Sequence, residues 1–341
     1  MRVKRWPWLG WLALLFSLNC YGDTMDKFNW QASESGPKGY PMEVVSGYFY
    51  FPEEGSLYVP NGVTLHNGWG LGRSSHLVGP ELKPLPNRLD ITFFSYTENQ
   101  FYRGQFALPY ETILALFQAG YYSPKEGEHI TYRRIVVGIA PGGAVAVWLV
   151  GIDRTTEVFF GQAEPAEVDW RRVIDNPDIT REAFIQTEID DSLDITEREA
   201  LQKNGIPFGR WAGYRDRYDW QPHFNGLEIL DGEVSRIDYF NGENGYLTYP
   251  LTPDEVATRR ALPQRMIFVW QREHAQNLLL KLHFNEAELF SAFKQLGNEE
   301  PIQLELRMKR RDNQMIFTQW LNNEQHSIQL KYVEIEHYGA S

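Results

Sequence analysis

The feature that most constrains the fold is a pattern that occurs twice in the 341 residues. One copy begins at Asn29-Trp30-Gln31 and the other at Asp219-Trp220-Gln221. Further along, Leu85-Pro86-Asn87-Arg88-Leu89 corresponds to Leu262-Pro263-Gln264-Arg265-Met266. Such internal similarity indicates that one structural unit is repeated. We therefore expect the two parts of the chain to fold alike.

Each copy predicts the same succession of elements: an apolar strand, a hairpin partner, a helix and a second hairpin. Gly120 and Gly297 are placed to end the two helices, and Asn285 is placed to begin the second. The apolar helix faces are Ile113, Leu114, Leu116 and Phe117 in the first copy, and Leu289, Phe290 and Phe293 in the second. The pattern predicts an α+β fold of two tandem related domains, each an antiparallel sheet with one packed helix.

A region of different composition lies between the copies, and its acidic residues outnumber its basic ones. Helices are expected over residues 180–193 and 196–204, with Thr196 and Glu199 forming a capping box. This region predicts a short, acidic, helical connector. The expected organisation is a signal segment at 1–22, a first α+β domain at 23–163, the acidic helical connector at 164–210 and a second α+β domain, a degenerate copy, at 211–341.

The N-terminus has the composition of an export signal. Three basic residues precede an apolar run at residues 8–18, which is too short to span a bilayer. The only cysteine, Cys20, follows that run. Two interpretations stay open: acylation of Cys20 as a lipid anchor, although Asn19 departs from the small residue usual there, or cleavage after Gly22. With one cysteine, no disulfide can form within the chain.

Charge and motifs exclude several functions. A formal net charge of −12 disfavours contact with phosphate backbones, so no nucleic-acid partner is expected. The chain has neither a Gly-x-Ser-x-Gly nor a His-Glu-x-x-His motif, and its eight histidines are scattered. We therefore predict no catalytic residues, no metal site and no cofactor.

One stretch, residues 68–76, is unusually rich in glycine and carries side chains suited to binding. We predict a partner-binding loop there, with Trp69, Arg73 and His76 as its candidate contact residues. The alternative hypothesis is a serine-type hydrolase, in which Ser74 or Ser75 is the nucleophile and a histidine comes from elsewhere.

Several segments resemble one family of Gram-negative envelope proteins. The segments are residues 39–45, 47–52, 78–86, 101–104, 106–110 and 155–161. They are similar to domain-of-unknown-function family 2931, whose members resemble uncharacterised lipoproteins. The resemblance implies a cell-envelope location, either as an outer membrane lipoprotein facing the periplasm or as a soluble periplasmic protein if Cys20 is not acylated. It also implies a link to type VI secretion gene clusters and their phospholipase toxins.

These observations favour a non-enzymatic module that binds another protein. The expected partner is a secreted effector, and the expected role is that of an immunity protein against a lipolytic effector acting in the periplasm. Membrane contact is expected through the N-terminal lipid. The alternatives are the serine-type hydrolase and a structural envelope lipoprotein.

Overall fold

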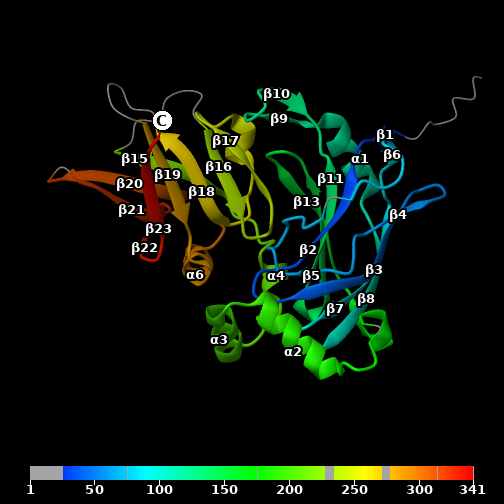
Figure 1. The fold of residues 1–341 in the computed structure, drawn as a ribbon. Helices are drawn as coiled ribbons and strands as arrows, with labels where there is room; N and C mark the ends of the chain where they lie inside the picture. Colours follow the sequence, from blue (N-terminus) through cyan, green and yellow to red (C-terminus); the bar gives the residue numbers. More distant parts are fainter. Residues whose placement is uncertain are drawn as a thin grey trace, which may run out of the picture.

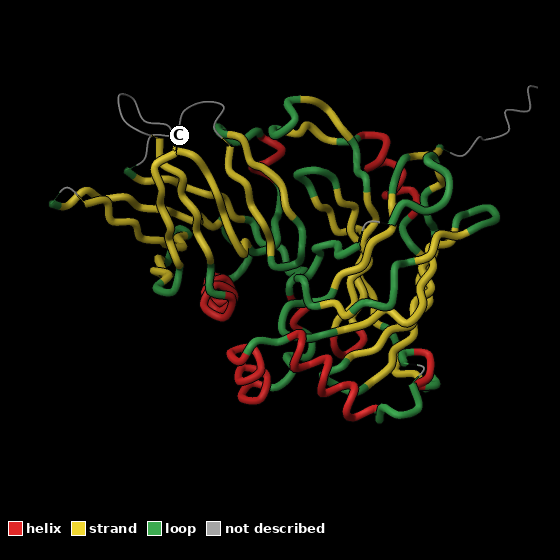
Figure 2. Tube along the Cα trace, in the orientation of Figure 1, coloured by secondary structure: helices red, strands yellow, loops and turns green. Residues whose placement is uncertain are grey.

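The computed structural model describes residues 26–340, apart from residues 75, 175, 227–233, 271–276 and 313. This part of the chain is made mostly of strands, with six α-helices (Figure 2). Most of the strand pairs are antiparallel. The combination of helices with mostly antiparallel sheets confirms that part of the predicted fold. Below, residues 26–166 are called the first half and residues 218–340 the second half.

The largest sheet has nine strands and runs through both halves (Figure 1). The halves meet in it where Thr155 pairs with Asn244. Each half was expected to have its own sheet, so this shared sheet differs from the prediction. In spatial order its strands are β2 (Gln31–Ser35), β11 (Arg134–Ala140), β12 (Ala144–Val150), β13 (Thr155–Gln162), β17 (Asn244–Thr248), β16 (Val234–Tyr239), β18 (Pro263–Trp270), β19 (Asn277–His283) and β23 (Glu334–Ala340).

Each half adds a further sheet. The first half contributes six strands: β14 (Glu164–Ala166), β8 (Gln100–Ala107), β7 (Arg88–Ser95), β3 (Met42–Tyr50) and β4 (Ser56–Tyr58) in order, with β5 (Thr64–Leu65) also on β3. The second half contributes four: β15 (Trp220–Asn225), β20 (Ile302–Arg311), β21 (Gln314–Asn322) and β22 (Ser327–Leu330). In both halves an early strand lies parallel to the first long strand after the helix, β2 to β11 and β15 to β20.

Each added sheet encloses a core against its own part of the nine-stranded sheet. In the first half Val137 and Val147 share a buried cluster with Phe93. In the second half Leu280 shares one with Leu304. The two largest clusters of buried apolar residues therefore lie one in each half, and strands β11 and β12 are buried along almost their whole length.

The two repeated tryptophans make equivalent contacts. Trp30 and Trp220 are both fully buried. The indole Nε1 of Trp30 donates to the carbonyl of Pro84, and that of Trp220 to the carbonyl of Ala261, each at 3.0 Å. Both acceptors stand directly before a Leu-Pro pair. The tryptophan and the Leu-Pro pair that occur in both sequence patterns are therefore linked in each half by the same buried hydrogen bond.

The helices of the two copies begin and end near the predicted residues. They are α1 (Tyr110–Ala119) and α6 (Glu286–Leu296). Asn285 caps α6 by accepting a hydrogen bond from the backbone of Glu288 at 3.0 Å, and Gly120 and Gly297 follow the two helices. The local capping rules therefore predicted these limits correctly.

Helix α2 (Arg181–Ser192) of the connector packs on the outer face of the six-stranded sheet. Phe184 and Ile185 belong to a cluster with Phe94 and Phe101 of that sheet. The Thr64 hydroxyl also donates to the Glu188 carboxylate of α2 at 2.5 Å. This helix is consequently part of the packing of the first half, and three of its acidic residues, Glu182, Asp190 and Asp191, are exposed.

Helix α3 (Ile195–Asn204) starts earlier than predicted. Its capping box is formed by Asp194 and Glu197 instead of Thr196 and Glu199. Asp194 has the extended backbone of an N-cap, and aspartate caps at least as well as threonine, so the box two residues earlier is the one that forms. The remaining elements are α4 (Arg210–Gly213), α5 (Pro253–Ala257), β1 (Lys27–Phe28), β6 (Lys83–Pro84), β9 (Tyr121–Ser123), β10 (Glu128–Ile130) and two 3₁₀ turns, Pro141–Gly143 and Trp170–Arg172.

The predicted export signal, with Cys20 and Gly22, lies outside the described residues. Within the described ranges, no helix has both the length and the apolar composition needed to cross a membrane.

Candidate functional site

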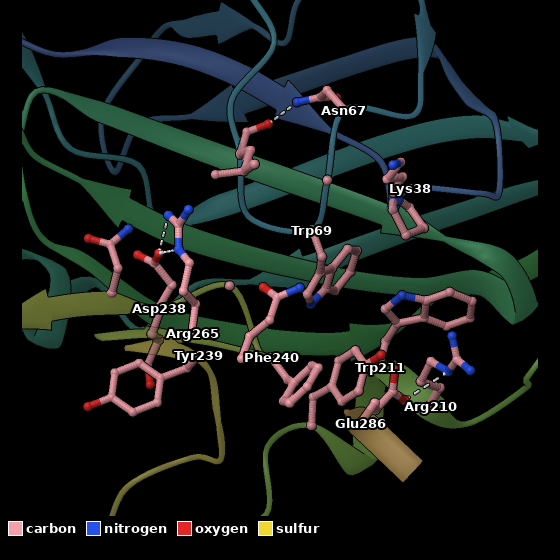
Figure 3. Close-up of a pocket in the computed structure, with 18 of the residues that line it drawn as sticks. Lys38, Asn67, Trp69, Arg210, Trp211, Asp238, Tyr239, Phe240, Arg265 and Glu286 are labelled. Carbon is pink, nitrogen blue, oxygen red and sulfur yellow. Dashed lines mark hydrogen bonds and ion pairs between the residues drawn. The ribbon is translucent and has the colours of Figure 1, made fainter. Parts of the chain in front are cut away.

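A cleft of about 500 Å³ lies between the two halves, beside helix α4 (Figure 3). Residues 37–40 and 67–71 of the first half form one wall. Strands β16 and β18 and the start of α6 contribute from the second half. The cleft therefore exists only because the two halves and α4 are packed together, which is typical of ligand and partner sites.

Aromatic rings in mutual contact line one side of the cleft and support it from behind. Trp69 lies edge-on to Trp148 at 4.9 Å between ring centroids, and at 6.3 Å from Trp211. Trp211 in turn meets Tyr40 edge-on at 5.6 Å. Trp148 and Trp211 are buried, and Trp148 Nε1 donates to the carbonyl of Asn241 in the second half at 3.1 Å. Rings held in this way form a rigid apolar surface with little side-chain entropy left to lose on binding.

Charged groups surround this aromatic surface. The Asp238 carboxylate lies 3.0 Å from the Arg236 guanidinium and 2.5 Å from that of Arg265. Across the cleft, Arg210 pairs with Glu286 at 3.2 Å, as Figure 3 shows with Trp69 between the two groups. Because two guanidiniums share the one Asp238 carboxylate and the Arg265 side chain is 40% exposed, donors remain accessible to a ligand.

The glycine-rich segment, residues 68–74, runs along strand β2. The Gly68 amide donates to the carbonyl of Gly36 at 2.9 Å, and the Arg73 amide to that of Glu34 at 2.8 Å. A side chain on Gly72 would meet Ser33 at 2.7 Å. The glycines therefore allow the segment to pack closely on the sheet, a structural role that the sequence interpretation missed.

The three candidate residues of the predicted binding loop lie in different surroundings. Trp69 is half-buried and lines the cleft. Arg73 and His76 are exposed, and neither lines it. His76 Nδ1 lies 3.0 Å from the hydroxyl of Tyr58. The structure thus places one of the three in the cleft.

The serines of the hydrolase hypothesis belong to the same segment. Ser74 donates to the Glu34 carboxylate at 2.5 Å, and Ser75 lies outside the described residues. Burial raises the pKa of Glu34 to about 7, while the Ser74 hydrogen bond acts in the opposite direction. Among the hydrogen bonds of the described residues, none joins Ser74 to His76. The same residues contain no group of three or more His, Cys, Asp or Glu side chains that could hold a metal ion.

A second charged cluster joins the halves next to the cleft. Glu157 forms an ion pair with Arg215, and Glu243 pairs with Arg217 at 2.8 Å. The Glu157 amide also donates to the Glu243 carboxylate at 3.1 Å. Burial raises the pKa of Glu157 to about 7, with Arg215 opposing that shift. This cluster fixes the relative position of the halves.

Sequence interpretation missed most of the cleft. Asp238, Trp211 and Glu286 carried no signal of their own, since they belong to different elements that only the fold brings together. Arg265 did carry one, because it is the arginine of the repeated Leu-Pro-x-Arg motif.

Fold and site together define a mixed α and β protein with an aromatic, charge-lined cleft between its halves. The family model described as a protein of unknown function, DUF2931, matches residues 19–209, more than half of the chain. The chain belongs to this family. The match ends just before α4. The cleft residues that α4 and the second half of the chain contribute therefore lie beyond the match. No curated protein and no solved structure matches the chain.

Proposed function

We propose that this chain is an exported, non-enzymatic binding protein of the cell envelope, and that the cleft between its halves binds another protein. The observation that carries the proposal is the half-buried Trp69 ring of the cleft, which Trp148 and Trp211 hold in place, beside partly exposed arginines. Tryptophan, tyrosine and arginine are the residues that most often dominate the free energy of protein interfaces.

The proposed location follows from the N-terminal sequence. Acylation of Cys20 would hold the protein at the outer membrane, facing the periplasm, whereas cleavage after Gly22 would release it into the periplasm. The measurement that separates the two is the mass of the mature N-terminal peptide.

The proposed partner is a lipolytic effector of a type VI secretion system, and the proposed role is immunity. The family resemblance supports this partner. Physically, an immunity protein that covers its target's active site needs an interface but no catalytic group of its own. The lack of Gly-x-Ser-x-Gly and His-Glu-x-x-His motifs in the sequence is compatible with such a role.

We also propose that the chain contains two related domains, residues 23–163 and 211–341, that arose by duplication. The strand order β14-β8-β7-β3-β4 in the first half corresponds to β23-β19-β18-β16-β17 in the second. The order β2-β11-β12-β13 likewise corresponds to β15-β20-β21-β22. The equivalent indole hydrogen bonds of Trp30 and Trp220 support the same proposal.

The test of function is a titration of the chain without its signal segment, residues 23–341, with the purified toxin encoded beside its gene. We expect saturable binding that Arg265→Ala weakens by about tenfold or more, since truncation of an interface arginine commonly costs at least ~1.4 kcal/mol. The matched control is Arg73→Ala, which removes an exposed arginine outside the cleft. Absence of saturable binding would refute the proposal, and loss of affinity only in Arg73→Ala would place the interface elsewhere.

A further inference from the structure

The segment of residues 76–82 is tied to the first described residues of the chain. Strands β1 and β6 pair with Lys27 opposite Pro84. The buried Lys83 ammonium donates to the carbonyl of Trp30 at 2.7 Å, and Asn29 donates to the carboxylate of Glu81 at 3.3 Å. The position of this segment is therefore coupled directly to β1, the first described strand of the chain (Figure 1).

This segment exposes an unusual amount of aliphatic surface. Leu77 is 87% exposed, Leu82 57% and Val78 36%. Three large apolar side chains within six residues are a cluster, whereas exposed apolar residues on a soluble surface are usually scattered singly. Leaving them in water costs free energy that contact with an apolar phase would recover.

The length of the N-terminal residues limits how far this surface can lie from a membrane. Lys27 follows Cys20 by seven positions, and a fully extended chain of seven residues spans at most roughly 25 Å. With a lipid on Cys20, the pair β1–β6 and the segment beside it would stay within that reach of the bilayer.

We propose that residues 76–82 form a membrane contact, in which Leu77, Val78 and Leu82 insert at the boundary between headgroups and acyl chains of the bilayer to which the chain is anchored. This rests on the lipid anchor proposed above. The lipid on Cys20 would tether the chain at one point only, so a second, apolar contact would orient the molecule on the membrane. Apart from His76, the segment has one ionisable side chain, Glu81, which accepts a hydrogen bond from Asn29. Because the segment has no lysine or arginine, the contact favours zwitterionic over anionic lipid.

The experiment uses the fact that Cys20 is the only cysteine. The mature chain without it, residues 21–341, therefore has no thiol, and Leu77→Cys creates one labelling site for an environment-sensitive fluorophore. An N-terminal histidine tag holds the protein on phosphatidylcholine vesicles that contain a nickel-chelating lipid. The matched control is Ile195→Cys on α3, because Ile195 is also strongly exposed, at 66%.

We expect the label at position 77 to shift to the blue on the vesicles and to be quenched by brominated lipid, and the label at position 195 to do neither. Adding Val78→Ser and Leu82→Ser to the Leu77→Cys chain should reduce that quenching. A label at position 77 that stays in water on the vesicle, or equal quenching at both positions, would overturn the proposal. The artificial tether keeps this result separate from acylation of Cys20 and from toxin binding in the cleft, which the earlier experiments test.

Discussion

Gly70 and Gly242 lie against each other where the two halves meet. A Cβ atom on Gly70 would stand 2.8 Å from both the Cα and the carbonyl oxygen of Gly242. Both glycines have positive φ, +79° and +86°. Gly242 belongs to the turn between β16 and β17, so this backbone contact joins that turn to the glycine-rich segment. The wall of the cleft thus depends on two positions that have no room for a side chain.

The first prediction is that Gly242→Ala destabilises the chain by about 3 kcal/mol. Roughly 1–2 kcal/mol of this is the cost of placing an L-residue in the left-handed region, and the remainder comes from separating the two backbones. Its Cβ would meet Gly70 Cα and the carbonyl oxygen of Trp69 at 3.0 Å. The measurement is urea unfolding followed by tryptophan fluorescence.

Its control is Gly62→Ala, at a glycine with φ +76° and open space around it. That variant carries only the backbone strain, so we expect a loss of about 1–2 kcal/mol. Equal losses in the two variants would show that the contact between Gly70 and Gly242 contributes nothing.

The second prediction concerns the attachment of α2. The Arg181 guanidinium lies 5.0 Å from the ring of Trp170 and 5.3 Å from those of Phe94 and Phe101, and it donates to the carbonyl of Asn99 at 2.9 Å. Arg181→Ala should destabilise the chain by about 1–2 kcal/mol, because cation–π contacts and a hydrogen bond are lost together. Urea unfolding measures the loss. Arg198→Ala removes a partly exposed ion pair between Arg198 of α3 and Asp190 of α2. It should cost at most about 0.5 kcal/mol, so a larger loss there would contradict this account.

The third prediction concerns Trp69. Trp69→Ala should lower the free energy of unfolding by about 2–3 kcal/mol, because its contacts with Trp148 and Trp211 disappear and the cleft loses its central ring. Trp69→Phe keeps an aromatic ring and should cost less than about 1.5 kcal/mol. Chemical denaturation of both variants gives the comparison, and equal losses would show that ring contact is not what stabilises the cleft.

Features that depend on neighbours in sequence were predictable. Asn285 with Glu288, and the glycines that follow α1 and α6, identified the helix limits because capping acts over three or four residues. The Asp194 cap of α3 was misplaced by two residues, since two overlapping boxes satisfied the same rule and local sequence alone did not rank them.

Features that depend on long-range packing were not predictable. The pairing of Thr155 with Asn244 joins residues from different copies, and neither strand's alternation specifies its neighbour. The cleft could not be predicted for the same reason. Asp238 and Arg265 meet because β16 and β18 are adjacent in the sheet. Trp69 was identified because its flanking glycines are unusual, although those glycines proved to serve close packing.

Glu34 makes stability depend on pH. Its side chain is fully buried, and burial raises its pKa from the ordinary 4.5 to about 7. The folded state therefore holds this proton more tightly than the unfolded state does. The resulting stability is complete below about pH 4.5 and is lost as the pH rises through about 7.

The fourth prediction is that Glu34→Gln flattens this dependence. A glutamine can still accept the Ser74 hydrogen bond but has no proton to lose, so the variant should avoid up to about 3 kcal/mol of the wild-type loss between pH 5 and pH 8. Glu157 has a raised pKa as well and is unchanged in this variant, so a smaller decline should remain. The measurement is urea unfolding at a series of pH values, with Glu53→Gln on the exposed β3–β4 turn as control. Glu34 would not be the group responsible if the Glu34→Gln curve ran parallel to that of the wild type across this range.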